Sequence, residues 1–210
     1  MKKIIAVVSV VCLGACVCVG QTAQEVLEMV KKKYDSINDA QLKFSQKARF
    51  ELARIEEHAN GTLFVKKGNK YRVELEEQTI VTNGATVWSY SLPNNQVLID
   101  NFKLQDNPFS PEKILTGAPK DFYATTLGRE RVGKSEAIVL KLVPKDDQSV
   151  VKSMKLWVDD GDWLIKKVEI SDVNGKQTEY LVNDIKVNIG LTDSRFTYQI
   201  PEGVEIVDLR

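Results

Sequence analysis

Large apolar side chains recur at every second position along much of this chain, and residues 61–92 show the pattern most clearly. A period of two places alternate side chains on one side of a β-sheet. The segment therefore predicts three strands, each with one apolar face, joined by turns that contain Gly and Asn. Such a face must be covered by protein or must bind something else. The apolar positions in this segment are Leu63, Val65, Tyr71, Val73, Leu75, Trp88, Tyr90 and Leu92.

The same period continues on both sides of this segment. Turn signals such as Asn83-Gly84 and Asn174-Gly175 separate the apolar runs. About eleven antiparallel strands joined by hairpins form a meander, which at that length usually curls into a barrel or a partial barrel. The predicted fold class is therefore mainly β. The strands are expected at residues 40–52, 60–65, 70–76, 78–83, 86–92, 96–100, 122–129, 137–144, 151–159, 164–173, 177–189 and 195–198.

The N-terminal part of the domain has helical spacing instead. Thr22 and Glu25 are placed as in a capping box, in which each side chain satisfies a free backbone amide at the helix start. Val26, Leu27 and Val30 then fall on one helical face. A helix of about four turns is predicted to open the domain.

A second helix is predicted within residues 107–117. Ser110 stands at the position of an N-cap and Pro111 at the first helical position. This short helix interrupts the meander, where it can act as a lid over the mouth of a curved sheet. Its apolar residues are Phe109, Ile114 and Leu115.

Residues 1–20 have the pattern of a signal peptide. Lys2 and Lys3 precede an apolar run of about ten residues, too short to span a bilayer. Cleavage before Gln21 would export a single domain, residues 21–210. Without a linker or an internal repeat, no further domain is expected.

The three cysteines, Cys12, Cys16 and Cys18, all lie in this leader. If cleavage follows residue 20, the mature chain has no disulfide. The sequence Leu-Gly-Ala that precedes Cys16 also resembles a bacterial lipobox, after which Cys16 would carry lipid. A soluble exported product and a membrane-anchored one both remain open.

Composition argues against several classes of function. Lys+Arg and Asp+Glu are equal at 29 each, so no net attraction to nucleic acid is implied. The single histidine, His58, lies in a polar stretch without a nucleophile motif. Asp159-Asp160-Gly161-Asp162 is typical of a hairpin turn rather than of a calcium loop. We therefore predict no enzyme activity, no catalytic residue, no metal and no cofactor.

What remains is apolar surface. A curved sheet of about eleven strands encloses an interior wider than side chains can fill, because about eight strands is the size that they just fill. One helix and one short lid can cover only part of it. A cavity for an apolar ligand is therefore predicted.

Several segments in order resemble the LolA family of periplasmic carriers of outer-membrane lipoproteins. The resemblance covers nearly the whole mature chain, and the order of the segments makes it more specific than any one of them. The segments are residues 44–46, 61–67, 71–73, 81–84, 87–90, 107–109, 196–198 and 201–204.

This resemblance implies an unclosed antiparallel barrel whose helices cover an apolar concavity. It implies a monomeric periplasmic chaperone that takes acylated lipoproteins from an inner-membrane ABC transporter of the LolCDE type. A LolB-type receptor at the outer membrane, if one is present, would accept them. No covalent chemistry is needed, since burial of acyl chains supplies the binding energy.

The resemblance also suggests site residues. In the family, a basic residue after the second strand fastens the lid, and Lys67 matches that position, followed by Gly68. Lys offers a point charge rather than a planar fork, so a Lys67 latch is expected to be weak, with Arg72 as the alternative. The residues expected to line the lipid-binding cavity are Leu63, Val65, Tyr71, Val73, Trp88, Tyr90, Phe109, Ile114, Leu115 and Leu156.

Other functions are less well supported by the residues. A lipid-anchored receptor or lipoprotein-sorting relative requires lipid on Cys16. An RseB-like sensor of envelope stress would carry an extra domain, for which this chain is too short. A secreted hydrolase would have only His58 and scattered acids to use.

Overall fold

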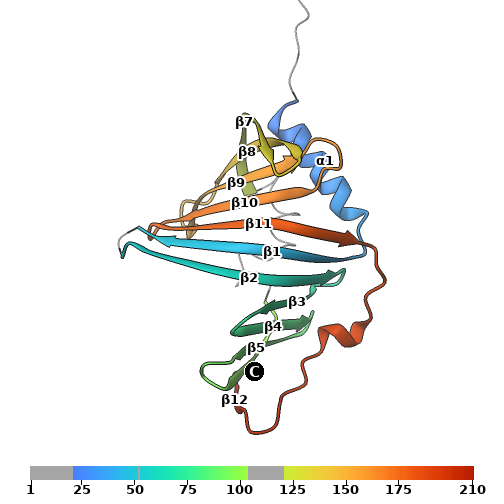
Figure 1. The fold of residues 1–210 in the computed structure, drawn as a ribbon, viewed down its shortest axis with the longest axis vertical. Helices are drawn as coiled ribbons and strands as arrows, with labels where there is room; N and C mark the ends of the chain where they lie inside the picture. Colours follow the sequence, from blue (N-terminus) through green and yellow to red (C-terminus); the bar gives the residue numbers. More distant parts are fainter. Residues whose placement is uncertain (1–20, 52, 104–120) are drawn as a thin grey trace, which may run out of the picture.

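The computed structural model describes residues 21–51, 53–103 and 121–210, and its main feature is one large sheet (Figure 1). The strand order is β12-β6-β5-β4-β3-β2-β1-β11-β10-β9-β8-β7. Neighbours run antiparallel except β12, which runs parallel to β6. β7 and β12 form the two edges, so the sheet is unclosed. The strands are β1 (Asp39–Phe50), β2 (Ile55–Lys66), β3 (Lys70–Leu75), β4 (Gln78–Asn83), β5 (Thr86–Ser91), β6 (Gln96–Asn101), β7 (Phe122–Val132), β8 (Ser135–Pro144), β9 (Val151–Asp159), β10 (Ile165–Asp172), β11 (Lys176–Val187) and β12 (Glu205–Asp208).

The predicted fold class, a mainly β, unclosed antiparallel barrel with an N-terminal helix, is confirmed. The strands expected at residues 78–83 and 151–159 have those bounds in the structure. The chain departs from the meander at β1, which pairs with both β2 and β11 and so joins the two halves of the sequence in one sheet.

In the C-terminal part, one prediction is wrong and one strand was not predicted. The expected strand at residues 195–198 is replaced by a short 3-10 helix, η2 (Asp193–Phe196). Phe196 is fully buried there, so burial of one aromatic rather than strand pairing fixes this segment. The strand β12 was not predicted, because its neighbouring apolar residues Ile206 and Val207 break the period of two. It forms by pairing with β6. At the start of this pairing, the Glu205 N–H donates to the carbonyl of Asn95, the residue before β6, at 3.0 Å.

The helix α1 (Ala23–Asp35) begins with the predicted capping box. The Thr22 hydroxyl accepts the Glu25 N–H at 3.3 Å, and the Glu25 carboxylate accepts the Thr22 N–H at 2.8 Å. These two bonds satisfy amides that a helix start otherwise leaves free. In the described part of the chain, no helix has the length and apolarity to cross a membrane.

The main core lies between α1 and strands β7 to β10. We call the side of the sheet that α1 covers the helix face. Val26, Leu27 and Val30 of α1 pack among apolar side chains of this face, including Leu140 and Leu156, which are 0% and 1% exposed. Burying each such side chain contributes about 1.5–3 kcal/mol. Figure 1 shows α1, in blue, at the end of the sheet that carries β7 to β10.

Candidate functional site

Beyond α1, apolar side chains from neighbouring strands line up on the same helix face. Leu42 of β1 lies opposite Leu63 of β2, which lies opposite Val73 of β3, which lies opposite Ile80 of β4. Directly opposed residues of paired strands share a face. Counting residue pairs back through β1, β11 and β10 places this row on the face that carries Leu156.

The residues of this row are partly exposed, whereas those beneath α1 are buried. The helix is therefore too short to cover the whole face. We name the uncovered part the open apolar surface. It consists of Phe44, Leu63, Val65, Val73, Leu75, Ile80 and Val87.

Close packing makes this surface continuous. A Cβ at Gly61 would lie 2.6 Å from the Phe44 ring and 2.7 Å from a Leu75 methyl group, so only glycine lets these two side chains meet. The Phe44 ring also meets that of Tyr180 edge-on, with centroids 6.0 Å apart. Apolar contact thus runs from β11 through β1 to β3.

The end of α1 is fastened beside the open apolar surface. The buried Tyr34 hydroxyl accepts the Ile165 N–H at 3.2 Å, and burial raises the pKa of Tyr34 to about 12. The Lys67 ammonium donates to the Asp35 carbonyl at 2.8 Å. A cation at a helix C-terminus is favourable because carbonyl groups there carry partial negative charge. Lys67 thus links the turn after β2 to the last residue of α1.

The predicted cavity residues divide into three groups. Leu63, Val65, Tyr71 and Val73 lie together on the helix face, where Tyr71 is buried and its ring centroid is 6.5 Å from that of Phe102. Leu156 shares that face but lies beneath α1.

Trp88 and Tyr90 do not join this set. Trp88 lies opposite Val81 and Ile99, on the other side of the sheet. Side chains of β5 alternate between the two faces as predicted. However, Val87 rather than Trp88 lies on the face of Tyr71, because both Val87 and Tyr71 are paired with Thr82. Phe109, Ile114 and Leu115, together with the short lid helix, lie outside the described residues.

The other side of the sheet is covered by a C-terminal segment, residues 188–204, which we call the strap. Figure 1 shows the strap, in red, leaving β11 and running along the molecule to β12. Its η2 helix lies against β3 and β4. The Tyr198 ring stacks on that of Tyr90, with centroids 6.0 Å apart. We call this side the strap face; Phe64 and Phe196 are buried there, whereas Trp88 and Tyr90 are partly exposed.

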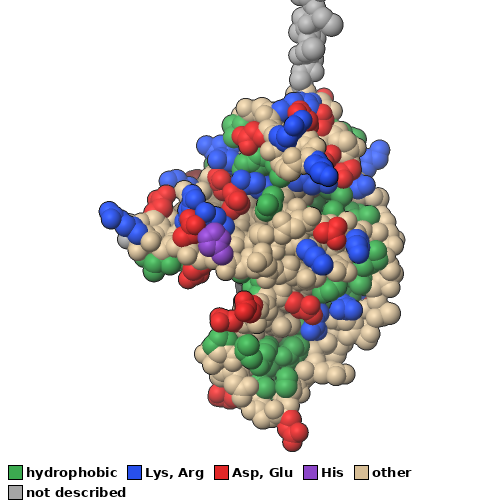
Figure 2. All heavy atoms as spheres, viewed as in Figure 1, with side chains coloured by type: hydrophobic (Ala, Val, Ile, Leu, Met, Phe, Trp, Pro, Cys, Tyr) green, Lys and Arg blue, Asp and Glu red, His purple; other side chains and the backbone are tan. Residues whose placement is uncertain are grey.

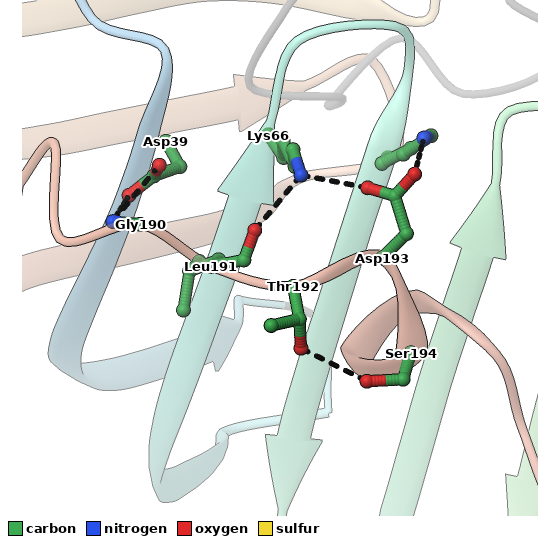
Figure 3. A network of polar contacts seen from close by, with 8 residues as sticks. Asp39, Lys66, Gly190, Leu191, Thr192, Asp193 and Ser194 are labelled. Carbon is green, nitrogen blue, oxygen red and sulfur yellow. Dashed lines mark hydrogen bonds and ion pairs between the residues drawn. The ribbon is translucent and has the colours of Figure 1, made fainter.

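Polar contacts hold the first half of the strap (Figure 3). The buried Asp39 carboxylate accepts the N–H groups of Ile189 and Gly190, at 2.8 and 3.1 Å. The Lys66 ammonium donates to the Leu191 carbonyl at 2.8 Å and to the Asp193 carboxylate at 2.7 Å. Lys70, from the neighbouring strand, donates to the other Asp193 oxygen at 2.9 Å. One carboxylate thus joins the strap to two strands.

Arg72, the alternative latch residue, lies on the strap face rather than near α1. It is on β3 opposite Val81, and its Nε donates to the Glu74 carboxylate at 2.5 Å. Sequence reasoning missed the strap contacts, because Lys66 and Asp193 are 127 residues apart and no local pattern joins them.

The polar groups considered as candidates for chemistry make local contacts in the described part of the chain. No group of three or more His, Cys, Asp or Glu in that part of the chain could hold a metal ion. His58 is exposed, and its Nε2 lies 3.0 Å from the Glu56 carboxylate. This pair lies near the projecting end of the β1–β2 hairpin, and the surface is hollowed below that end (Figure 2). The Asp159 carboxylate accepts the N–H groups of Gly161 and Asp162, as expected for the turn between β9 and β10. Acidic and basic side chains are interspersed over the face shown in Figure 2.

Comparison with known proteins gives a family match. Residues 35–199 match the family model described as outer membrane lipoprotein carrier protein LolA. The outer-membrane lipoprotein carrier protein of Psychromonas ingrahamii is 26% identical over 223 residues, and the alignment covers 100% of both chains. An uncharacterized protein of Methanocaldococcus jannaschii is 28% identical over 144 residues, which cover 67% of this chain and 41% of that protein.

A solved structure shares the fold. The crystal structure of an uncharacterized conserved protein from Thermus thermophilus superposes with a TM-score of 0.60 at 18% sequence identity. The superposition covers 89% of this chain and 98% of that one. At this level of identity the likeness concerns the arrangement of strands and helix.

The strap contacts predict a pH dependence of stability. Hydrogen bonds from Lys66 and then Lys70 lower the pKa of Asp193 from 3.8 to about 2. A lowered pKa in the folded state adds stability that is complete above the unfolded-state pKa and is lost as pH falls towards the folded-state value. In urea unfolding, wild type should exceed Asp193→Asn in stability near neutral pH. The difference should close between about pH 4 and pH 2.

Asp147→Asn is the matched control, since Asp147 is exposed and forms no ion pair in the described structure. It should follow the wild-type profile over the whole range. A wild-type advantage over Asp193→Asn that stayed constant down to pH 2 would contradict the assignment of this carboxylate.

Proposed function

The chain belongs to the LolA family, and from this premise we propose that it carries lipoproteins by binding their acyl chains on the open apolar surface. The observation that carries the proposal is the incomplete cover of the helix face. Phe44, Leu63, Val73 and Ile80 stay partly exposed beside a core that α1 seals. An apolar surface of this kind in an exported protein calls for an apolar partner.

Acyl chains suit this surface chemically. Each methylene buried against apolar side chains contributes about 0.8 kcal/mol, without any need for matching polar groups. The open apolar surface offers aliphatic and aromatic groups from several strands rather than a single pocket with polar contacts. Such a surface accepts chains of different length and would not distinguish between lipoproteins by their acyl chains.

The C-terminal end of α1, beside this surface, is the part that would move. α1 carries its apolar stripe against β7 to β10, and its last residue is held by Lys67 through a single exposed hydrogen bond. A lysine contact of this kind contributes little to stability compared with the buried core. We infer that Lys67 fastens α1 while the carrier is empty. Releasing this contact would free the C-terminal turn of α1, while Val26, Leu27 and Val30 keep the core around Leu156 covered.

In this proposal the protein is a non-enzymatic chaperone of the periplasm. It takes acylated lipoproteins from an inner-membrane ABC transporter of the LolCDE type and delivers them to the outer membrane, to a LolB-type receptor where one exists. Release requires that the acceptor bind the acyl chains more tightly than the carrier does. An open surface with partial cover supports such a limited affinity.

Replacing Val73 by Glu tests the binding surface. The carboxylate would have to lose its water shell against the acyl chains, which is costly without a partner. Capture of a radiolabelled lipoprotein released from spheroplasts should fall at least about tenfold, which corresponds to 1.4 kcal/mol of binding free energy.

Val143→Glu is the matched control, because Val143 is an exposed strand residue on the opposite side of the sheet from Leu142 and Leu140. It should capture lipoprotein as wild type does. Circular dichroism of both variants establishes that they fold. Normal capture by a folded Val73→Glu variant would count against the open apolar surface as the acyl site.

The exported state is tested by the mass of the mature protein. A carrier that moves between membranes is expected as a water-soluble product that starts at Gln21. Mass spectrometry of the periplasmic fraction should give the mass of residues 21–210 without lipid. A product that begins at an acylated Cys16 and stays in the membrane fraction would favour the anchored receptor over the shuttle.

A further inference from the structure

The strap and β3 line a solvent-open cavity of about 380 Å³ on the strap face, away from the open apolar surface. Basic and hydroxyl-bearing side chains dominate its wall, unlike the aliphatic groups of the helix face. It is open to solvent on the strap side, where most of its lining residues are exposed. Its lining residues are Arg72, Ser194, Arg195, Thr197, Tyr198 and Gln199.

Arg72 lines this cavity from β3 and is held by one carboxylate. Its side chain is only 23% exposed, and its Nε donates to Glu74, two residues along the same strand. That bond uses one of the five guanidinium N–H donors. Within the described residues, the terminal amino groups of Arg72 form no other hydrogen bond.

Arg195 lines the cavity from the strap and is positioned by an aromatic ring. Its guanidinium carbon lies 4.5 Å from the centroid of the buried Phe64 ring. Stacking on an aromatic ring fixes the plane of a guanidinium group and leaves its edge free to donate hydrogen bonds. In the part of the chain that the structure describes, Arg195 has no carboxylate partner.

Asp193, the nearest acid in sequence to Arg195, does not neutralise the cavity. Its two carboxylate oxygens are taken by Lys66 and Lys70. Among the residues joined by these ion pairs and by the Arg195 ring contact, four are cations and two, Asp193 and Glu74, are carboxylates. The strap adds hydroxyl groups from Ser194, Thr197 and Tyr198, which can donate to an anion.

We propose that this cavity binds a phosphate group, either free or at the head of a lipid. Two guanidinium groups from different elements, in a cavity that hydroxyl groups also line, match the several oxygens of a phosphate better than the two oxygens of a carboxylate. The site lies on the face opposite the proposed acyl surface, so phosphate binding can be tested separately from lipoprotein binding. A phosphate bound there would link the strap to β3 and stabilise the folded strap.

Calorimetric titration with inorganic phosphate tests the site directly. Wild type should bind phosphate, and Arg195→Gln and Arg72→Gln should each bind at least about tenfold more weakly, as expected for the loss of a charge-assisted contact. Arg131→Gln makes the same charge change on the exposed edge strand β7 and should bind as wild type does.

Thermal unfolding provides a second measurement. Phosphate stabilises many proteins by exclusion from their surface, so the relevant quantity is the difference between wild type and variant at equal ionic strength in phosphate and in chloride. Phosphate should raise the unfolding midpoint more for wild type and Arg131→Gln than for Arg195→Gln. Equal shifts in all of them, or calorimetric binding that survives both Arg72→Gln and Arg195→Gln, would overturn the proposal.

Vesicles identify the source of the phosphate group. Phosphatidylglycerol vesicles should retain wild type but not Arg195→Gln if the ligand is a lipid head group, and inorganic phosphate should displace the protein from them. Binding of inorganic phosphate without retention on vesicles would assign the site to a free phosphate compound. Retention that is equal for wild type and Arg195→Gln would contradict a role of this cavity at a membrane surface.

Discussion

The extent to which each face of one wide sheet is covered governs the rest of this structure. A sheet of twelve strands presents apolar side chains on both sides, and the described chain has a single thirteen-residue helix with which to cover one of them. α1 seals the helix face over β7 to β10, and the strap seals the strap face over β3 and β4. The remaining part of the helix face, around Val73 and Ile80, stays partly exposed.

Under the proposed function, this division would let one fold be both stable and able to bind. The buried core under α1, which includes Leu140 and Leu156, supplies stability that does not depend on a ligand. The open apolar surface adjoins that core without being part of it, so a ligand can be gained and lost while the sheet persists. The strap packs on the other face, held by Asp39 and Lys66 of the sheet and by its own buried Phe196. This C-terminal segment therefore does not cover the helix face.

The sequence predicted most strands because the period of two survives in each of them, and the capping box at Thr22 marked the start of the helix. It could not assign faces between strands. Trp88 and Tyr71 each alternate correctly, but the turns between them decide which residues are in register, and Trp88 faces the strap. Likewise, the contact of Lys67 with the end of α1 and that of Lys66 with Asp193 join distant segments. Such contacts depend on the folded sheet and leave no local pattern.

The helix face, and not the strap face, is the side of the sheet that we propose holds the acyl chains. Photo-crosslinking from two adjacent residues tests it most directly, because Ile80 and Thr79 are both partly exposed and point to opposite sides of β4. A benzophenone amino acid at position 80 should form an adduct with the acyl part of a bound lipoprotein, and the same group at position 79 should not. Adducts that form mainly from position 79, or equally from both positions, would contradict the account.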